Sequence, residues 1–315
     1  MRLAVYLPLL FPLLAAAAAR PMAERLEPRL ATWLLTVSAT ALAAAGSAAL
    51  ALLALAGAVR IPLVADLGHL SQRIIRRDDP AALSIALLAA LLLTVAVAAT
   101  ARMLWRRVRA LIGAVTEAAC LPGPDQLVVR DDPAAEAFAI PGLPGRIVVS
   151  TGMLTALDPD EHQALLAHER AHLRCHHYLF VTFTQLAATA NPLLRPLATA
   201  VAYTTERWAD ESAALACGDR HQVARAIGKA ALATTRTRPP GRLTTMAMGL
   251  LGRFHTRRAP GPVPRRVAAL LAPCPRNRPL PLAAAVAVLA ATAVCSLEAA
   301  YDFHGLLELA RTPRR

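Results

Sequence analysis

The sequence contains few aromatic and few charged side chains. Aromatic residues make up 4% of the 315 residues, and Asp, Glu, Lys and Arg together make up 17%, against about 25% charged residues in an average soluble domain. Hydrophobic residues make up 56% of the chain, and its mean hydropathy is +0.44. These values argue against a wholly soluble protein and favour a membrane protein that carries one polar domain.

Lysine is almost absent from the chain. Lys229 is the only lysine, so the net charge of +13 comes from arginine. Excess basic charge can indicate a nucleic acid or an anionic lipid surface as partner. The sequence has no evident recognition helix or aromatic platform for nucleic acid, and many of its arginines flank apolar runs. We therefore expect the lipid bilayer as a partner and no direct contact with nucleic acid.

The cysteines are few, odd in number and widely spaced. None belongs to a CxxC pair, so the cysteine pattern indicates neither a disulfide framework nor a thiolate zinc site. We interpret them as scattered small apolar residues, which favours a reducing compartment for the polar domain; they are Cys120, Cys175, Cys217, Cys274 and Cys295.

Long apolar runs give the expected architecture. A span needs about 20 apolar residues, and four runs approach or exceed that length. We expect a mainly α membrane protein with about four transmembrane helices and a polar α+β domain with a small sheet. In order, the expected parts are residues 1–104 as a membrane region with spans at about 3–19, 30–59 and 81–103, residues 105–278 as the polar domain, residues 279–299 as the fourth transmembrane helix and residues 300–315 as a short tail.

The first apolar run has two interpretations. It follows Arg2 and ends in an alanine run at 17–19, which fits a cleaved signal peptide, but we favour a retained span. Arginines flank the polar region on both sides, at 102–109 and at 265–278. The positive-inside rule then places the polar domain in the cytoplasm of a multi-pass plasma-membrane protein, although the arginines at 73–77 oppose this orientation.

Within the polar region the local pattern predicts strands first and helices later. Apolar and β-branched residues favour strands at 126–130, 137–140 and 146–150, with glycine and proline at 141–145 between the last two. A strong helix start follows, with Asp158 as N-cap, Pro159 at N1 and Glu161 at N3.

The apolar stretch 180–201 is interrupted at Asn191-Pro192, so we expect two helices that meet there rather than a fifth span. The second should end near Gly218. Beyond it we expect a helix at 219–233, a loop at 234–264 and a short amphipathic helix at 265–271.

Residues 168–172 read His-Glu-Arg-Ala-His, the HExxH pattern of a zinc peptidase. Histidines four apart lie on one helix face, with Cβ atoms about 5–6 Å apart, so they can share one metal. The pattern predicts His168 and His172 as ligands of one Zn²⁺ per chain. It predicts Glu169 as the catalytic residue that takes a proton from the metal-bound water.

A catalytic zinc needs a third protein ligand and an open position for water. Glu206 and Asp210 are four apart on a later predicted helix, so both can face the first helix. We expect Glu206 to be the third ligand, and Asp210 to assist catalysis by hydrogen-bonding a ligand histidine. His176, four residues after His172, is the alternative third ligand; otherwise we expect His176 and His177 to be solvated.

An exposed helix face is the simplest alternative interpretation of an isolated HExxH pattern, and a surface ion pair is the simplest one for Glu206. The capped helix start and the second acidic helix together argue against both.

Four segments carry a resemblance to a known group. Residues 137–142, 147–154 and 161–172, with the later Glu206-xxx-Asp210-xx-Ala213 pattern, resemble the HtpX/CAAX-prenyl-protease superfamily of membrane zinc peptidases (gluzincins), and most of all its BlaR/MecR antirepressor branch. The resemblance covers about residues 126–271. It implies Glu206 as the third ligand with Asp210 as its supporting acid, and an edge strand near Phe138 and Ile147 that receives the substrate backbone.

The sequence departs from that pattern in two places. Relatives often have asparagine before the Ala-Phe pair, where this chain has Glu136, which affects an expected substrate contact. Sensors of the BlaR type carry a penicillin-binding domain after the last span, and the sequence ends at Arg315, so direct β-lactam sensing is not expected.

We therefore expect residues 105–278 to form an α+β, zincin-like zinc metallopeptidase domain, and the chain to be an integral-membrane, zinc-dependent endopeptidase. We expect it to act in regulated proteolysis on a protein or peptide substrate such as a transcriptional repressor. An HtpX-like peptidase for membrane-protein quality control is one alternative. A non-catalytic membrane signalling scaffold is the other, and the intact Glu169 argues against it.

Overall fold

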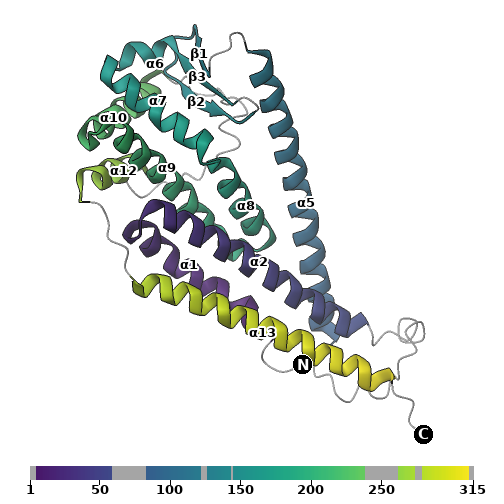
Figure 1. The fold of residues 1–315 in the computed structure, drawn as a ribbon. Helices are drawn as coiled ribbons and strands as arrows, with labels where there is room; N and C mark the ends of the chain where they lie inside the picture. Colours follow the sequence, from purple (N-terminus) through teal and green to yellow (C-terminus); the bar gives the residue numbers. More distant parts are fainter. Residues whose placement is uncertain are drawn as a thin grey trace.

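The computed structural model shows a mainly helical chain with one small sheet (Figure 1). The residues that the structure describes are 5–58, 83–121, 126–142, 145–237, 262–273 and 279–311. The expected connector with arginines at 73–77 and most of the expected loop at 234–264 lie outside these ranges.

Four of the described helices are long and apolar enough to cross a membrane. They are α1 (Leu7–Arg25), α2 (Pro28–Ala58), α5 (Leu83–Cys120) and α13 (Pro279–Arg311). Helices α1, α2 and α13 pack side by side, whereas α5 leaves this group to reach the sheet (Figure 1). The number and order of these helices agree with the expected spans.

Helix α1 extends further than the expected first span. It includes Pro12 and Pro21 and continues to Arg25. Only Leu26 and Glu27 therefore separate α1 from α2, a shorter connection than the residues 20–29 left between the first two expected spans. The two helices consequently meet in a tight elbow.

Helix α5 also extends beyond its expected end at Met103. The residues that follow include Arg, Leu and Ala, which favour helix, and no proline interrupts them. The last part of α5 packs Ala114 and Ala118 against the sheet residues Ile140 and Val148. The expected boundary between residues 104 and 105 thus falls inside one continuous helix.

The sheet has the three strands that the sequence predicts. They are β1 (Leu127–Arg130), β2 (Ala137–Ile140) and β3 (Arg146–Ser150), in the order β1-β3-β2. Strand β3 pairs with β1 in parallel and with β2 in antiparallel. Phe138 therefore lies on an edge strand as expected, but the expectation for Ile147 is wrong, because Ile147 belongs to the buried central strand.

Helix α7 (Pro159–Arg174) begins at the predicted residue. Asp158 is its N-cap, and Glu161 Oε2 accepts a hydrogen bond of 3.0 Å from the Asp158 amide in a capping box. Lys229 Nζ lies 2.8 Å from the same Glu161 oxygen and 2.7 Å from Asp158 Oδ2. The only lysine of the chain thus supports the start of the helix that carries the HExxH pattern.

A helical hairpin follows α7. Helix α8 (His177–Ala190) ends before Asn191, a short 3-10 turn covers Pro192–Leu194, and α9 (Arg195–Cys217) ends at Gly218, which has a φ of 74°. The predicted break at Asn191-Pro192 and the predicted end near Gly218 are both confirmed.

Three further helices lie in the described part of the polar region. They are α6 (Thr151–Ala156), α10 (Arg220–Thr237) and α12 (Pro262–Leu271). Helix α10 continues into the first residues of the expected loop, and α12 starts a few residues before its expected position. Helix α12 packs against both α9 and α10.

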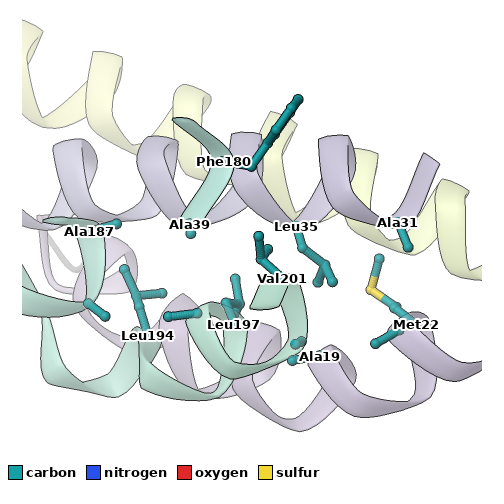
Figure 2. Close-up of a cluster of buried hydrophobic side chains, with 14 of the residues drawn as sticks. Ala19, Met22, Ala31, Leu35, Ala39, Phe180, Ala187, Leu194, Leu197 and Val201 are labelled. Carbon is teal, nitrogen blue, oxygen red and sulfur yellow. The ribbon is translucent and has the colours of Figure 1, made fainter. Parts of the chain in front are cut away.

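The α8–α9 hairpin and the α1–α2 pair share one hydrophobic core. Figure 2 shows Leu35 of α2 and Phe180 of α8 in the same cluster as Leu197 and Val201 of α9. Trp33 and Phe180 also make an edge-to-face contact, with ring centroids 4.8 Å apart. The expected division at 104/105 stays a prediction, but the hydrophobic packing crosses it.

Buried polar contacts join α9 to the elbow between α1 and α2. Arg207 Nη1 donates a 2.8 Å hydrogen bond to the Ala23 carbonyl, and the hydroxyls of Thr32 and Thr204 lie 2.8 Å apart. Arg207 directly follows Glu206. The elbow therefore helps to fix the position of α9 along its axis and its rotation about that axis. Two of the expected site residues lie on α9.

Candidate metal centre

The two histidines of the HExxH pattern point to a common position. One helical turn of α7 separates His168 from His172, and their Nε2 atoms lie 3.1 Å apart. His168 and Glu169 are buried, each with 8% of its surface exposed. The α-helical spacing therefore places both imidazoles on the inner face of α7, as the sequence predicts.

Glu206 reaches these histidines from α9. Its Oε1 lies 3.4 Å from His172 Nε2, and its Oε2 lies 3.7 Å from His168 Nε2. Helices α7 and α9 pack along their length, which brings the three side chains together. One ligand atom from each of His168, His172 and Glu206 lies within 4.8 Å of the others.

These distances can be compared with the geometry of zinc. Zn–N and Zn–O bonds of about 2.0–2.2 Å in a tetrahedron put neighbouring ligand atoms about 3.3–3.5 Å apart. The separations of 3.1, 3.4 and 3.7 Å bracket that value. Two imidazole nitrogens and one carboxylate oxygen are also a common donor set of catalytic zinc, so the residues present fit this metal.

The second nitrogen of each ligand histidine has a partner that can fix its tautomer. His168 Nδ1 lies 3.0 Å from Asp210 Oδ1, and His172 Nδ1 lies 2.9 Å from His177 Nδ1. With protons on their Nδ1 atoms, both histidines donate to these partners and present bare Nε2 atoms to a metal. The pairing of His168 with Asp210 is the contact that the sequence led us to expect.

His177 contradicts its expected solvation. It is fully buried between His172 and Trp208, with its ring centroid 4.7 Å from that of Trp208. His176, the alternative third ligand, adopts a left-handed conformation with a φ of 50° at the junction of α7 and α8. Because α7 ends before it, His176 does not follow His172 by one turn of the same helix, and its side chain is exposed.

Glu169 lies between the histidines and the edge strand β2. Its carboxyl group forms a hydrogen bond with the Ala139 backbone, and burial raises its pKa above the ordinary value. A raised pKa suits a group that accepts a proton and returns it near neutral pH. The geometry thus supports the expected position of Glu169 beside the metal ligands.

The sheet register determines which backbone groups of β2 face this site. The Ser150 amide donates to the Glu136 carbonyl, so hydrogen-bonded pairs recur at Phe138–Val148 and Ile140–Arg146. The amides and carbonyls of Ala137 and Ala139 therefore point away from β3. They form the outer edge of the sheet on the side where Glu169 lies, and the Glu169 carboxyl group engages the Ala139 backbone there.

Glu136 has a partner within the sheet region. Its Oε2 lies 2.9 Å from Arg130 Nη2, and its amide donates a hydrogen bond to the Ser150 hydroxyl. In this chain the residue before the Ala-Phe pair is therefore held by an ion pair.

Arg266 is a component of the centre that the sequence interpretation missed. Its Nη1 lies 2.8 Å from Glu206 Oε2, and its Nη2 lies 2.6 Å from Asp210 Oδ1. The sequence interpretation counted Arg265 and Arg266 among the arginines beside a membrane span, whereas both engage acidic side chains of the folded chain. The signal that could have found Arg266 was the acidic pair Glu206 and Asp210, because two carboxylates buried close together need a cation nearby.

Burial and neighbouring charges shift the pKa values of the two ligand histidines in opposite directions. Although burial opposes it, hydrogen bonding to Asp210 and Glu206 raises the pKa of His168 to about 10 in the metal-free protein. Burial lowers the pKa of His172 to about 4 and that of His177 to about 3. Although burial opposes this too, the Arg266 charge holds the pKa values of Glu206 and Asp210 below their ordinary range, so both are ionised.

Comparison with known proteins agrees with this geometry. Residues 98–192 match peptidase family M48, a stretch that includes the HExxH pattern and ends before Glu206. A relative, the plastoglobule-localized metallopeptidase 48 of Arabidopsis thaliana chloroplasts, is 36% identical over 103 residues, which cover 31% of this chain and 29% of the relative. No solved structure matches.

Neither the family match nor the relative tests the narrower resemblance to the BlaR/MecR branch, which stays a prediction. Both findings support a metallopeptidase of the M48 superfamily.

Proposed function

We propose that the chain is an integral-membrane zinc endopeptidase. The observation that carries the proposal is the convergence of His168, His172 and Glu206 beside the buried carboxyl group of Glu169. Zinc held by these three ligands would polarise the scissile carbonyl and lower the pKa of a bound water to about 7.

The chain's own residues supply proton transfer and orientation. Glu169 takes a proton from the attacking water and passes it to the nitrogen of the leaving amine. Asp210 and His177 hold the ligand histidines in the required tautomer. Asp210 therefore assists catalysis through His168 rather than by touching the substrate.

The outer edge of β2 is suited to bind the substrate backbone. An extended peptide can pair with the outward amide and carbonyl of Ala137 and with the outward carbonyl of Ala139, as a strand added to a sheet edge. Such pairing places the scissile bond beside Glu169, because this carboxyl group hydrogen-bonds Ala139. It also explains how a peptidase can accept many side chains, since the contacts are made by backbone atoms.

The apolar helices support the membrane part of the proposal. Only 17% of the apolar window of α5 and 11% of that of α13 are buried within the chain. Leu87, Leu91 and Val97 of α5 are each about 60% exposed, and lipid tails would cover such side chains. We further propose a cytoplasmic site that acts in regulated proteolysis, on the basis of the arginines that flank the domain and of the BlaR-like motifs.

Zinc content and peptide cleavage, measured on the purified full-length protein in detergent, test whether the protein is a zinc endopeptidase. We expect about one zinc per chain and cleavage of β-casein, an unfolded protein, by the wild type. Glu169→Gln should keep the zinc and lose cleavage, whereas the control Glu117→Gln, an exposed residue on α5, should retain both. Equal cleavage by the wild type and Glu169→Gln would contradict the proposal.

A further inference from the structure

Arg266 binds two carboxylates of α9, those of Glu206 and Asp210, from a separate helix. It reaches Asp210 with two hydrogen bonds, Nε to Oδ2 at 2.8 Å and Nη2 to Oδ1 at 2.6 Å. A third contact of 2.8 Å joins Nη1 to Glu206 Oε2. Its side chain is only 11% exposed, so α12 places a buried positive charge at the edge of the metal centre.

The electrostatics of α9 explain why a cation is needed there. Glu206 and Asp210 lie one turn apart on the same face, and Asp210 is 1% exposed. Two like charges at this spacing repel each other, and a buried carboxylate without a partner is costly. A planar guanidinium with five donors can bind both at once, which a lysine ammonium cannot do with the same geometry.

The two oxygens of Glu206 face different groups. Arg266 holds Oε2 at 2.8 Å, and the same oxygen lies 3.7 Å from His168 Nε2, whereas Oε1 lies 3.4 Å from His172 Nε2. The Arg266–Asp210 pair leaves Asp210 Oδ1 within 3.0 Å of His168 Nδ1. The same guanidinium therefore occupies one oxygen of Glu206 and holds Asp210 beside His168.

We propose that Arg266 is a positioning residue of the metal centre, which restricts Glu206 to one ligand oxygen and holds Asp210 against His168. This inference rests on the zinc peptidase function proposed above. Single-oxygen ligation matters because it leaves the fourth position of a tetrahedral site for water. Arg266 thus acts through Glu206 and Asp210 and needs no contact with the substrate.

The neighbouring Arg265 offers a matched control on the same helix. It points to the α1–α2 elbow, where its Nη2 lies 2.8 Å from Glu24 Oε1 and its guanidinium carbon lies 4.3 Å from the Tyr203 ring centroid. Replacing Arg265 therefore removes a charge and a contact of α12 without touching the centre.

The test measures zinc binding by full-length protein in detergent, with zinc alone as the probe and a chelator as competitor. Loss of a residue that orients metal ligands typically costs about 10–100-fold in metal affinity, and we expect this loss for Arg266→Gln. Arg266→Lys should recover little of it, because an ammonium cannot reproduce the bidentate contact. Arg265→Gln should bind zinc like the wild type.

Cobalt substitution gives a second measurement that does not depend on activity. Four-coordinate Co²⁺ absorbs more strongly in the visible range than ions of higher coordination number. If Arg266 limits Glu206 to one oxygen, Co²⁺ bound to Arg266→Gln should absorb more weakly than in the wild type, and Arg265→Gln should be unchanged. An Arg266→Gln protein with wild-type zinc affinity and an unchanged cobalt spectrum overturns the inference.

A double variant keeps the test decisive if Arg266→Gln folds poorly. Asp210→Asn with Arg266→Gln removes one charge of each sign, and its loss of zinc affinity should be smaller than the product of the two single losses, because the residues act as a unit. Fully multiplicative losses overturn the role of Arg266 in holding Asp210. Failure of the wild type to bind zinc would instead refute the proposed function itself.

Discussion

Replacing Arg207 should loosen the junction between the α1–α2 elbow and α9 without removing a metal ligand. The Arg207 side chain is 4% exposed and donates a 2.8 Å hydrogen bond to Ala23. The Ala23 carbonyl belongs to the last turn of α1, where helix carbonyls lack an amide partner within the helix. Arg207→Met removes this contact and leaves a buried carbonyl in an apolar environment.

The magnitude follows from the contacts. A hydrogen bond that involves a charged group contributes about 1.5–3 kcal/mol, and a buried group left without a partner costs about 1–3 kcal/mol. Part of this loss is offset, because within the described residues Arg207 Nε has no hydrogen-bond partner. We therefore expect a net destabilisation of about 2 kcal/mol, which corresponds to a fall of about 4–8 °C in the unfolding midpoint.

Tryptophan fluorescence during thermal unfolding in detergent measures this effect. Trp33 and Trp208 both contact Phe180 near the junction, so their emission reports on its opening. Arg195→Met is the matched control, since Arg195 is exposed at the start of the same helix, and it should shift the midpoint little. An Arg207→Met midpoint equal to that of the wild type would refute the reasoning, as would loss of bound zinc without destabilisation.

Three further predictions concern the centre itself. Asp210→Asn should lower zinc affinity about 10–100-fold, measured by chelator competition, and unchanged affinity would show that the contact with His168 is dispensable. Because the metal-free pKa of His168 is raised to about 10, zinc must displace a proton below that pH, so affinity should rise with pH. About one proton should be released near pH 6, below the pKa of about 7 expected for zinc-bound water. Calorimetry in buffers of different ionisation enthalpy counts that proton, and a count of zero would contradict the charged state of His168. Ala137→Pro removes an amide that points away from β3 and should abolish peptide cleavage with zinc retained, as judged by metal content; wild-type cleavage would argue against substrate binding at this edge.

Features determined by neighbouring residues were predictable from the sequence. The capped start at Asp158 and the break before Pro192 depend on residues within one turn of each position. The histidine spacing is equally local, because an α-helix fixes where His168 and His172 point. These signals located α7, the hairpin and the three strands before any tertiary contact was known.

Features that depend on distant contacts were not predictable in the same way. Arg266 comes close to Glu206 only because α12 returns to pack on α9, and in the sequence it looks like any basic residue near a membrane span. His177 is buried because the chain turns at His176 in a left-handed conformation. No residue pattern predicted this turn. Hydropathy marked where the apolar part of α5 ends, but the helix itself continues, because nothing in the following residues interrupts it.

The position of Arg266 in the chain affects the order in which the centre is completed during synthesis. Glu206 and Asp210 are made before Arg266, and at about 5–20 residues per second the intervening residues take about 3–11 s to synthesise. During that interval the two carboxylates lack this guanidinium partner. The candidate centre therefore gains the buried cation that offsets its paired negative charges only when α12 packs on α9.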